Sequence, residues 1–361
     1  MPLNADELLS GPRGRRLCLE VALRTDRAAD CPSGALGSRA TPERVADLLG
    51  ALGPFDVDAA TLADALDVAV ATSRCWQDPD GEDVLAARPD VRAALRPAAQ
   101  AVVGCGASSW WSAPLDRTDQ WRVRFDGHAE AALQARGSAT DDVLAAWRAE
   151  ALETEAQFRA VDGIMVSQPP DPADAPGWAA VGGLPVHGPW WSIPPTALLG
   201  STRPWSAGRA PGPATTGPVG LSLVEDAWNE DDATAVRVSV TPGARVLEID
   251  GADAWADLCR RYPLDVSASR RTVWLEATGR DGRWLVPDWS RVARDVDAVH
   301  LTVAGYLATV GRAVDVGDGW ATVLAGWDPD RTSWFRGASL DEAVTQRWHL
   351  DREVGWLRAE G

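Results

Sequence analysis

Apolar positions in the first part of the chain recur at helical spacing and predict that residues 5–160 are mostly helical. Leu62, Leu66 and Val70 lie four residues apart, which places them on one face of a helix. One segment departs from this pattern, because residues 121–125 alternate between apolar and charged side chains. Alternation with a period of two predicts a β-strand there.

Prolines and polar caps set the ends of further predicted helices. Pro42 opens the segment PERVADLLGALG, which has proline in its first turn and glycine after its last apolar residue, as helix ends prefer. Residues 82–103 predict one or two helices with breaks at Pro89 and Pro97, because proline lacks the amide that continues a helix. Thr140 precedes two aspartates and a run of strong helix formers, which predicts a helix of about 20 residues.

The composition changes near residue 165. Residues 166–218 contain stretches such as SQPPDPADAPGW and PWSAGRAPGPATTGP, which are rich in proline, glycine, alanine and threonine. Such stretches are typical of loops and linkers. We therefore predict one domain over residues 1–165, a linker or loop over 166–218, and a second domain over 219–361.

The second domain consists of short apolar or alternating runs, which are typical of strands. We predict strands at 219–224, 235–240, 245–249, 273–276, 284–286, 298–303 and 320–325, with short helices at 254–261 and 289–294. Residues 339–358 predict a closing amphipathic helix, because Ser339 and Glu342 have the spacing of a capping box. The whole pattern predicts an α+β fold, with a mainly helical N-terminal domain followed by a mixed or antiparallel β-sheet with short helices.

Composition excludes several classes of function. The chain contains no lysine, since all 35 basic residues are arginine. This rules out pyridoxal-phosphate enzymes, Schiff-base aldolases and nucleotide-binding P-loops, all of which need a lysine. The net charge of −17 disfavours nucleic acid and anionic membranes as partners. No apolar run approaches the roughly 18–20 residues of a membrane span.

The cysteines and histidines are scattered and lack the spacing of a metal site. Cys18, Cys31, Cys75, Cys105 and Cys259 form no C-x-x-C pair, and no H-E-x-x-H motif is present. We therefore expect no metal, and reduced thiols in a cytoplasmic protein. The N-terminal residues also carry their charges in the wrong order for a signal peptide.

Tryptophan is unusually frequent, with 19 residues against 2 tyrosines and 4 phenylalanines. Most tryptophans fill a core, but an indole can also line a cleft and stack on a flat ring, and arginine can pair with phosphate. The densest candidate site therefore lies in and after the segment HGPWWSIPPTALLGSTRPWS. Its candidate residues are His187 and Glu225 for catalysis, and Trp190, Trp191, Ser192 and Arg203 for ligand binding. The alternative is a proline-rich loop with packed tryptophans.

A second candidate site lies where a short helix leads into a predicted buried strand. His300 and Thr302 alternate in that strand and are expected to face the same side. Histidine can exchange protons near neutral pH, which makes His300 a catalytic candidate and Thr302 a ligand-binding one. The alternative is a histidine whose hydrogen bonds are satisfied at the edge of the core. A third segment, residues 326–332, predicts a turn that Asp328 caps.

The order of these segments in the C-terminal half resembles the ADP-ribosyltransferase-like fold. The matching pieces are His187-Gly188, Trp190-Trp191-Ser192, and residues 236–250, 295–303 and 322–330. The resemblance implies that NAD is the substrate, that His187 or Arg203 touches its ribose or phosphate, and that Ser192 supports the nicotinamide pocket.

This sequence departs from the family pattern at one position. The glutamate that such enzymes carry at the start of the last strand has no counterpart near Val323. Either the matching pieces are misaligned with the family pattern, or the role falls to Glu225 or Asp318, or the domain is inactive.

Three functions stay open from the sequence. The first is an NAD-utilising transferase or glycohydrolase with a tryptophan-lined pocket, in which a carboxylate stabilises oxocarbenium-like charge. The second is an enzyme of secondary metabolism, in which His300 and a nearby aspartate transfer protons to a small aromatic substrate. The third is a non-catalytic interaction or regulatory protein, whose acidic surface would suit a basic protein partner.

Overall fold

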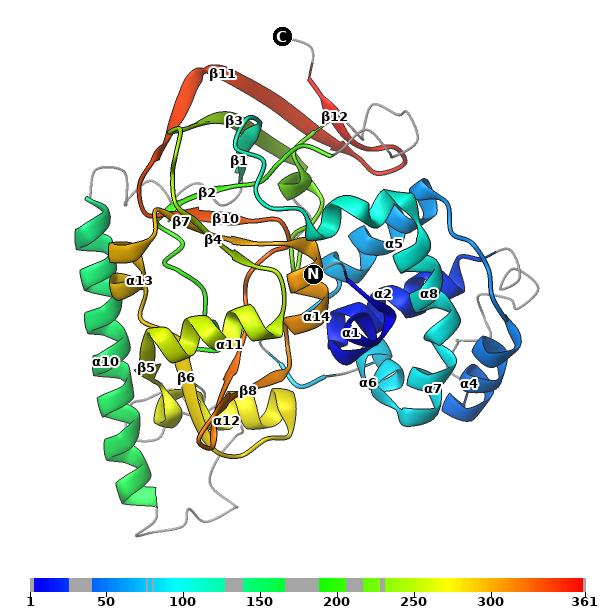
Figure 1. Ribbon diagram of the computed structural model, residues 1–361, viewed down its shortest axis with the longest axis horizontal. Helices are drawn as coiled ribbons and strands as arrows, with labels where there is room; N and C mark the ends of the chain where they lie inside the picture. Colours follow the sequence, from blue (N-terminus) through cyan, green and yellow to red (C-terminus); the bar gives the residue numbers. More distant parts are fainter. Residues whose placement is uncertain are drawn as a thin grey trace.

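The computed structural model describes residues 3–25, 41–75, 77–79, 81–126, 139–165, 188–205, 217–227 and 231–359. Within them a series of helices comes first, and three four-stranded sheets with short helices account for most of the rest, which confirms the predicted α+β fold. Figure 1 shows the N-terminal helices gathered on one side of the molecule and the sheets on the other.

The N-terminal part is mostly helical, as predicted, although residues 82–103 form three helices where one or two were predicted. The helices of this part are α1 (Ala5–Ser10), α2 (Pro12–Leu23), α4 (Pro42–Ala51), α5 (Ala59–Ala71), α6 (Gly81–Ala87), α7 (Pro89–Ala94), α8 (Arg96–Gly104) and the 3-10 helix η1 (Gly106–Ser112). The breaks predicted at the two prolines are confirmed, because α7 and α8 each begin with proline in the first turn. Leu62, Leu66 and Val70 form the buried face of α5, as their spacing predicts.

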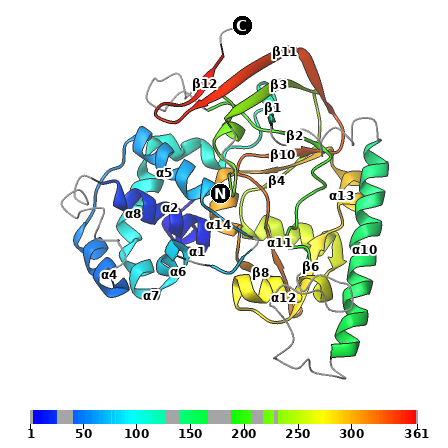
Figure 2. The same cartoon turned by 180° about the vertical axis from the view of Figure 1, so that it is seen from behind.

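Two segments from the first half of the chain pack with the C-terminal part, β1 in a sheet and α10 against helices. The predicted strand at 121–125 is confirmed as β1 (Gln120–Phe125), which pairs antiparallel with β3 (Asp232–Val240). Helix α10 (Thr140–Met165) packs against α12 (Ser267–Thr278) and α13 (Trp289–Asp295). Figure 2 shows α10 on the side of the sheets that faces away from the N-terminal helices. The domain division near residue 165 stays a prediction.

The predicted C-terminal helix is wrong, because residues 339–358 form a hairpin. Strand β11 (Ala338–Asp351) pairs with β3 and with β12 (Gly355–Arg358), which gives a sheet in the order β1-β3-β11-β12. The register of β11 against β3 shifts between Asp341 and Thr345. This irregularity interrupts the period of two, so Leu340, Val344 and Trp348 fall four residues apart and imitate a helix.

Two predicted strands are also wrong. Residues 273–276 belong to helix α12, where Val273 and Trp274 are buried and the next two side chains are exposed, as on a helix surface. Residues 219–224 contain the 3-10 helix η4 (Val219–Leu221) and a turn. In both cases a short apolar run could not distinguish a strand from a turn of helix.

The other two sheets hold the rest of the C-terminal part. One has the order β2-β10-β7-β4, with β2 (Leu199–Ser201), β10 (Thr332–Trp334), β7 (Ala298–Leu301) and β4 (Val246–Ile249). The other has the order β5-β6-β9-β8, with β5 (Pro263–Asp265), β6 (Arg283–Pro287), β9 (Trp320–Val323) and β8 (Ala313–Gly317). The predicted short helices are confirmed as α11 (Ala252–Arg261) and α13, and α14 (Val303–Thr309) follows β7. Among the residues that the structure describes, no helix has the length and apolarity to cross a membrane.

Many of the tryptophans belong to the core. Six of their rings are among the largest fully buried side chains: Trp111, Trp255, Trp274, Trp284, Trp289 and Trp327. Trp289 lies at the centre of one group, with ring centroids 6.2 Å from Trp255 and 5.9 Å from Trp327. For these residues the packing interpretation of the tryptophan content holds.

Candidate functional site

His300 lies at the centre of a buried chain of ionisable side chains. In the parallel pairing of β4 with β7, Glu248 is the register partner of His300. Glu248 Oε2 lies 2.5 Å from His300 Nδ1, and Asp330 Oδ1 lies 3.3 Å from His300 Nε2. The His300 side chain is fully buried, and both of its nitrogens face a carboxylate.

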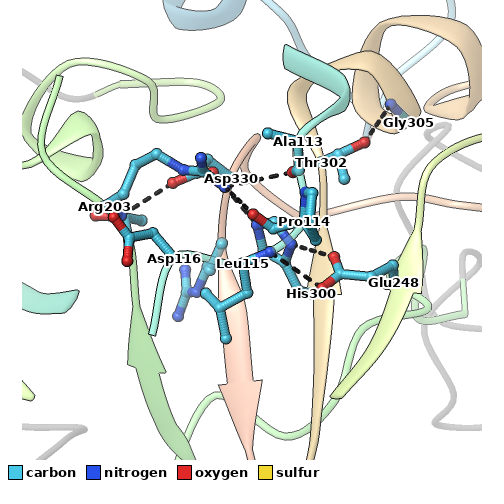
Figure 3. A network of polar contacts seen from close by, with 12 residues as sticks. Ala113, Pro114, Leu115, Asp116, Arg203, Glu248, His300, Thr302, Gly305 and Asp330 are labelled. Atoms are coloured by element: carbon cyan, nitrogen blue, oxygen red, sulfur yellow. Dashed lines mark hydrogen bonds and ion pairs between the residues drawn. The ribbon is translucent and has the colours of Figure 1, made fainter. Parts of the chain in front are cut away.

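Asp330 connects His300 to an arginine. Its backbone φ is 58°, a left-handed conformation, at the end of the turn that follows β9. Arg203 donates to the Asp330 carboxylate twice, from Nε at 2.6 Å and from its backbone amide at 2.9 Å. Figure 3 shows Asp330 between Arg203 and His300, with Glu248 on the other side of the imidazole. We call Arg203, Glu248, His300 and Asp330 the His300 cluster.

The charges of the His300 cluster balance when His300 is protonated, because two carboxylates then face an imidazolium and a guanidinium. Burial alone lowers the pKa of His300, but the hydrogen bonds and charges of Asp330 and Glu248 outweigh it, so the pKa lies above its ordinary value. The cluster therefore favours the protonated imidazole.

One end of the His300 cluster reaches solvent. The Glu248 side chain is 28% exposed, whereas the His300 and Asp330 side chains are 0% and 1% exposed. The second Glu248 oxygen accepts a hydrogen bond from the Leu115 amide at 3.1 Å. Arg203 donates to the carbonyl oxygen of Pro114 at 3.0 Å, so the segment between η1 and β1 fastens both ends of the cluster.

Thr302, which the alternation places beside His300, follows the end of β7 and caps helix α14. Its hydroxyl accepts a hydrogen bond from the Gly305 amide at 2.9 Å. Its side chain is buried and caps α14, and its role in ligand binding stays a prediction.

Glu225 lies in a second buried cluster. Its carboxylate accepts hydrogen bonds from Arg13 Nε at 2.8 Å, from the Tyr306 hydroxyl at 2.8 Å and from the Cys75 thiol at 3.2 Å. Burial raises the pKa of Cys75 to about 12, so this thiol is not an activated nucleophile. We call Arg13, Cys75, Glu225 and Tyr306 the Glu225 cluster.

The segment with the paired tryptophans lies against the start of the 326–330 turn. Ser192 forms three hydrogen bonds through its hydroxyl and backbone, two of them with Ala325 at 3.0 and 3.1 Å. The Trp190 ring lies so close to Gly326, which has a φ of 81°, that a Cβ there would come within 3.0 Å of it. Trp191 is 42% exposed. His187 lies outside the described residues.

Two members of the His300 cluster, Glu248 and Asp330, were not predicted as site residues. Glu248 was the only carboxylate in the predicted strand 245–249, but Arg245 is charged too, so the charge of Glu248 was a weak signal. Asp330 appeared only as part of a turn. In that turn Asp328 accepts hydrogen bonds from the Glu225 amide and from Arg331, so the turn lies between the two clusters.

The His300 cluster does not have the composition of a metal centre, because Arg203 occupies the Asp330 carboxylate. Among the described residues, no group of three or more histidine, cysteine, aspartate or glutamate side chains has a metal-binding arrangement. Comparison with protein-family models, curated proteins and solved structures finds no significant match for the chain.

Proposed function

We propose that this protein is an enzyme in which the Glu248 carboxylate is the catalytic group. His300, Asp330 and Arg203 hold this carboxylate in place. The observation that carries the proposal is the gradient of exposure along the His300 cluster. Glu248 is 28% exposed at one end, and the three side chains behind it are at most 9% exposed. A partly exposed carboxylate that buried charged side chains hold in position is suited to act on a bound substrate.

The chemistry that fits a fixed carboxylate is the stabilisation of positive charge. When the bond between nicotinamide and ribose breaks, nicotinamide leaves with the bonding electrons and the ribose becomes oxocarbenium-like. Water or an acceptor then attacks the ribose carbon and loses a proton. We propose NAD as the substrate, following the family resemblance, with Glu248 in the role of the glutamate that is missing near Val323.

The test is a comparison of two carboxylates at the His300 cluster, Glu248 and Asp116. Wild-type protein is incubated with NAD, and released nicotinamide is quantified by chromatography. We expect Glu248→Gln to lose activity by about 100-fold or more, as removal of one electrostatic contact to a transition state does elsewhere. Asp116→Asn removes an exposed carboxylate near Arg203 and serves as the control, with activity retained.

Two results would contradict this proposal. One is an absence of nicotinamide release together with an unchanged melting temperature at millimolar NAD. The other is activity that survives Glu248→Gln. If NAD is inert, the same pair of variants can be tested with small aromatic substrates, for which Glu248 and His300 would transfer protons.

A non-catalytic interaction protein is the second candidate. Its support is the complete burial of His300 with both nitrogens occupied, which is the arrangement of a structural charge network. The net charge of −17 suits a basic partner. Native mass spectrometry of protein purified from its own cells tests this candidate. A stoichiometric basic partner, bound equally by wild type and Glu248→Gln, would favour it over the enzyme.

A further inference from the structure

Arg270, on helix α12, is a buried cation without a matching carboxylate among the described residues. It is 7% exposed and lies in the first turns of a helix that packs beside α10 (Figure 1). Buried charges in proteins are normally paired, because removing an ion from water costs several kcal/mol. The other strongly buried arginines illustrate the rule, since Arg13 pairs with Glu225 and Arg203 with Asp330.

Among the residues that the structure describes, only two of the donors of Arg270 have a partner. A guanidinium has five N–H donors. In Arg270 one of them bonds Ser269 Oγ at 3.2 Å and another bonds the carbonyl oxygen of Trp191 at 3.1 Å. Nε is buried and has no hydrogen-bond partner. The Trp274 ring lies 5.9 Å from the guanidinium carbon, which eases burial of the cation but supplies no negative charge.

Glu155 is the carboxylate whose charge acts on Arg270, but its oxygens already accept hydrogen bonds from other groups. Its oxygens accept hydrogen bonds from the amides of Ala268 and Ser269, both at 2.9 Å, and from Arg159 at 3.1 Å. Glu155 therefore caps helix α12 and does not bond Arg270. Burial lowers the pKa of Arg270 to about 10, so the side chain still carries its charge at neutral pH.

We infer that Arg270 binds the carboxylate or phosphate group of a small ligand, at a site between helix α12 and the segment that carries Trp191. Free donors on a planar guanidinium match the two oxygens of such a group. The Trp191 carbonyl oxygen accepts a hydrogen bond from Arg270, and Trp191 is 42% exposed, so an exposed indole would border the bound ligand. This site is separate from the His300 cluster and does not depend on the proposed activity.

The experiment compares Arg270→Met with Arg271→Met. Arg271 is the neighbouring residue, but it is exposed and paired with Asp281, so it controls for the loss of one positive charge. Melting temperatures are measured in inorganic phosphate, in acetate and in chloride at equal ionic strength. Chemical shifts of the arginine Nε–H groups are recorded in the same solutions.

We expect phosphate, acetate or both to raise the melting temperature of wild type and Arg271→Met above the chloride value. A response to phosphate alone identifies a phosphoryl ligand, and a response to acetate alone identifies a carboxylate. The apparent affinity should fall by about 10-fold or more in Arg270→Met. Without anion, Arg270→Met should melt at the same temperature as wild type or higher, because it removes an uncompensated charge.

Three outcomes would overturn the inference. The first is a wild-type protein that responds to neither anion, by melting temperature or by the Arg270 Nε–H shift. The second is an equal response in Arg270→Met, which would place the anion elsewhere. The third is a lower melting temperature of anion-free Arg270→Met than of Arg271→Met, which would mean that the protein itself already neutralises Arg270.

Discussion

The His300 cluster and the Glu225 cluster both join distant parts of the chain, but only the His300 cluster contains a histidine, the side chain that can change its charge near neutral pH. In the Glu225 cluster, Arg13 is a permanent cation, and burial moves the pKa values of Cys75 and Tyr306 further from neutrality. In the His300 cluster, His300 can release its proton. We therefore expect a buried network to tolerate the loss of a carboxylate only when another member can adjust its charge.

The largest expected loss of stability comes from removing the carboxylate of Glu225, because no other member of its cluster can adjust its charge. Glu225→Gln leaves the Arg13 guanidinium buried without its main partner, and we expect a loss of about 3–5 kcal/mol in the free energy of unfolding. Urea denaturation measures it. Glu43→Gln, at an exposed ion pair with Arg88, is the control and should leave stability unchanged. A loss of less than about 1 kcal/mol for Glu225→Gln would remove the distinction between the clusters.

The pH dependence of stability should come from the His300 cluster. The pKa of His300 is raised in the folded protein, so the folded state binds this proton more tightly than the unfolded chain does. The stabilisation is complete below the unfolded value, about pH 6.5, and is lost as pH rises through the raised folded pKa. We expect a slope of at most about 1.4 kcal/mol per pH unit for one proton.

The test uses substitutions of two histidines that lie on different strands. Urea denaturation from about pH 6 to about pH 9 should show the slope in wild type and lose it in His300→Gln. His349→Gln, at an exposed histidine of β11, should keep the slope. A slope that persists in His300→Gln would assign the proton to another group.

A smaller effect tests whether the two clusters are coupled. Helix α14 begins at the Thr302 cap and carries Tyr306 of the Glu225 cluster, so fraying its first turn should loosen the Tyr306 hydrogen bond to Glu225. Thr302→Ala should cost about 1 kcal/mol, as the loss of a helix cap does. In a double-mutant cycle with Tyr306→Phe, we expect the two losses to be less than additive. Strict additivity would show that the cap and the Glu225 cluster act independently.

Local patterns in the sequence predicted the helices better than the site. The face of Leu62, Leu66 and Val70 is a local period, and it predicted α5 correctly. The hairpin of β11 was missed because a shift in register against β3 disguised its alternation. Glu248 was missed because its partner His300 is 52 residues away, and only the parallel pairing of β4 with β7 brings the two together. No periodicity records such a pairing.

The smallest expected change in stability belongs to the residue with the largest expected role. Glu248→Gln removes one carboxylate from the His300 cluster, but His300 can then release its proton, so Asp330 and Arg203 still balance. Because Glu248 is also 28% exposed, we expect a loss of about 1 kcal/mol or less at neutral pH. The decline of stability with rising pH should weaken in this variant, since Glu248 is one of the two carboxylates that raise the pKa of His300. A loss as large as that of Glu225→Gln would show that His300 keeps its proton when Glu248 is removed. The two clusters would then differ in exposure but not in their response to the loss of a carboxylate.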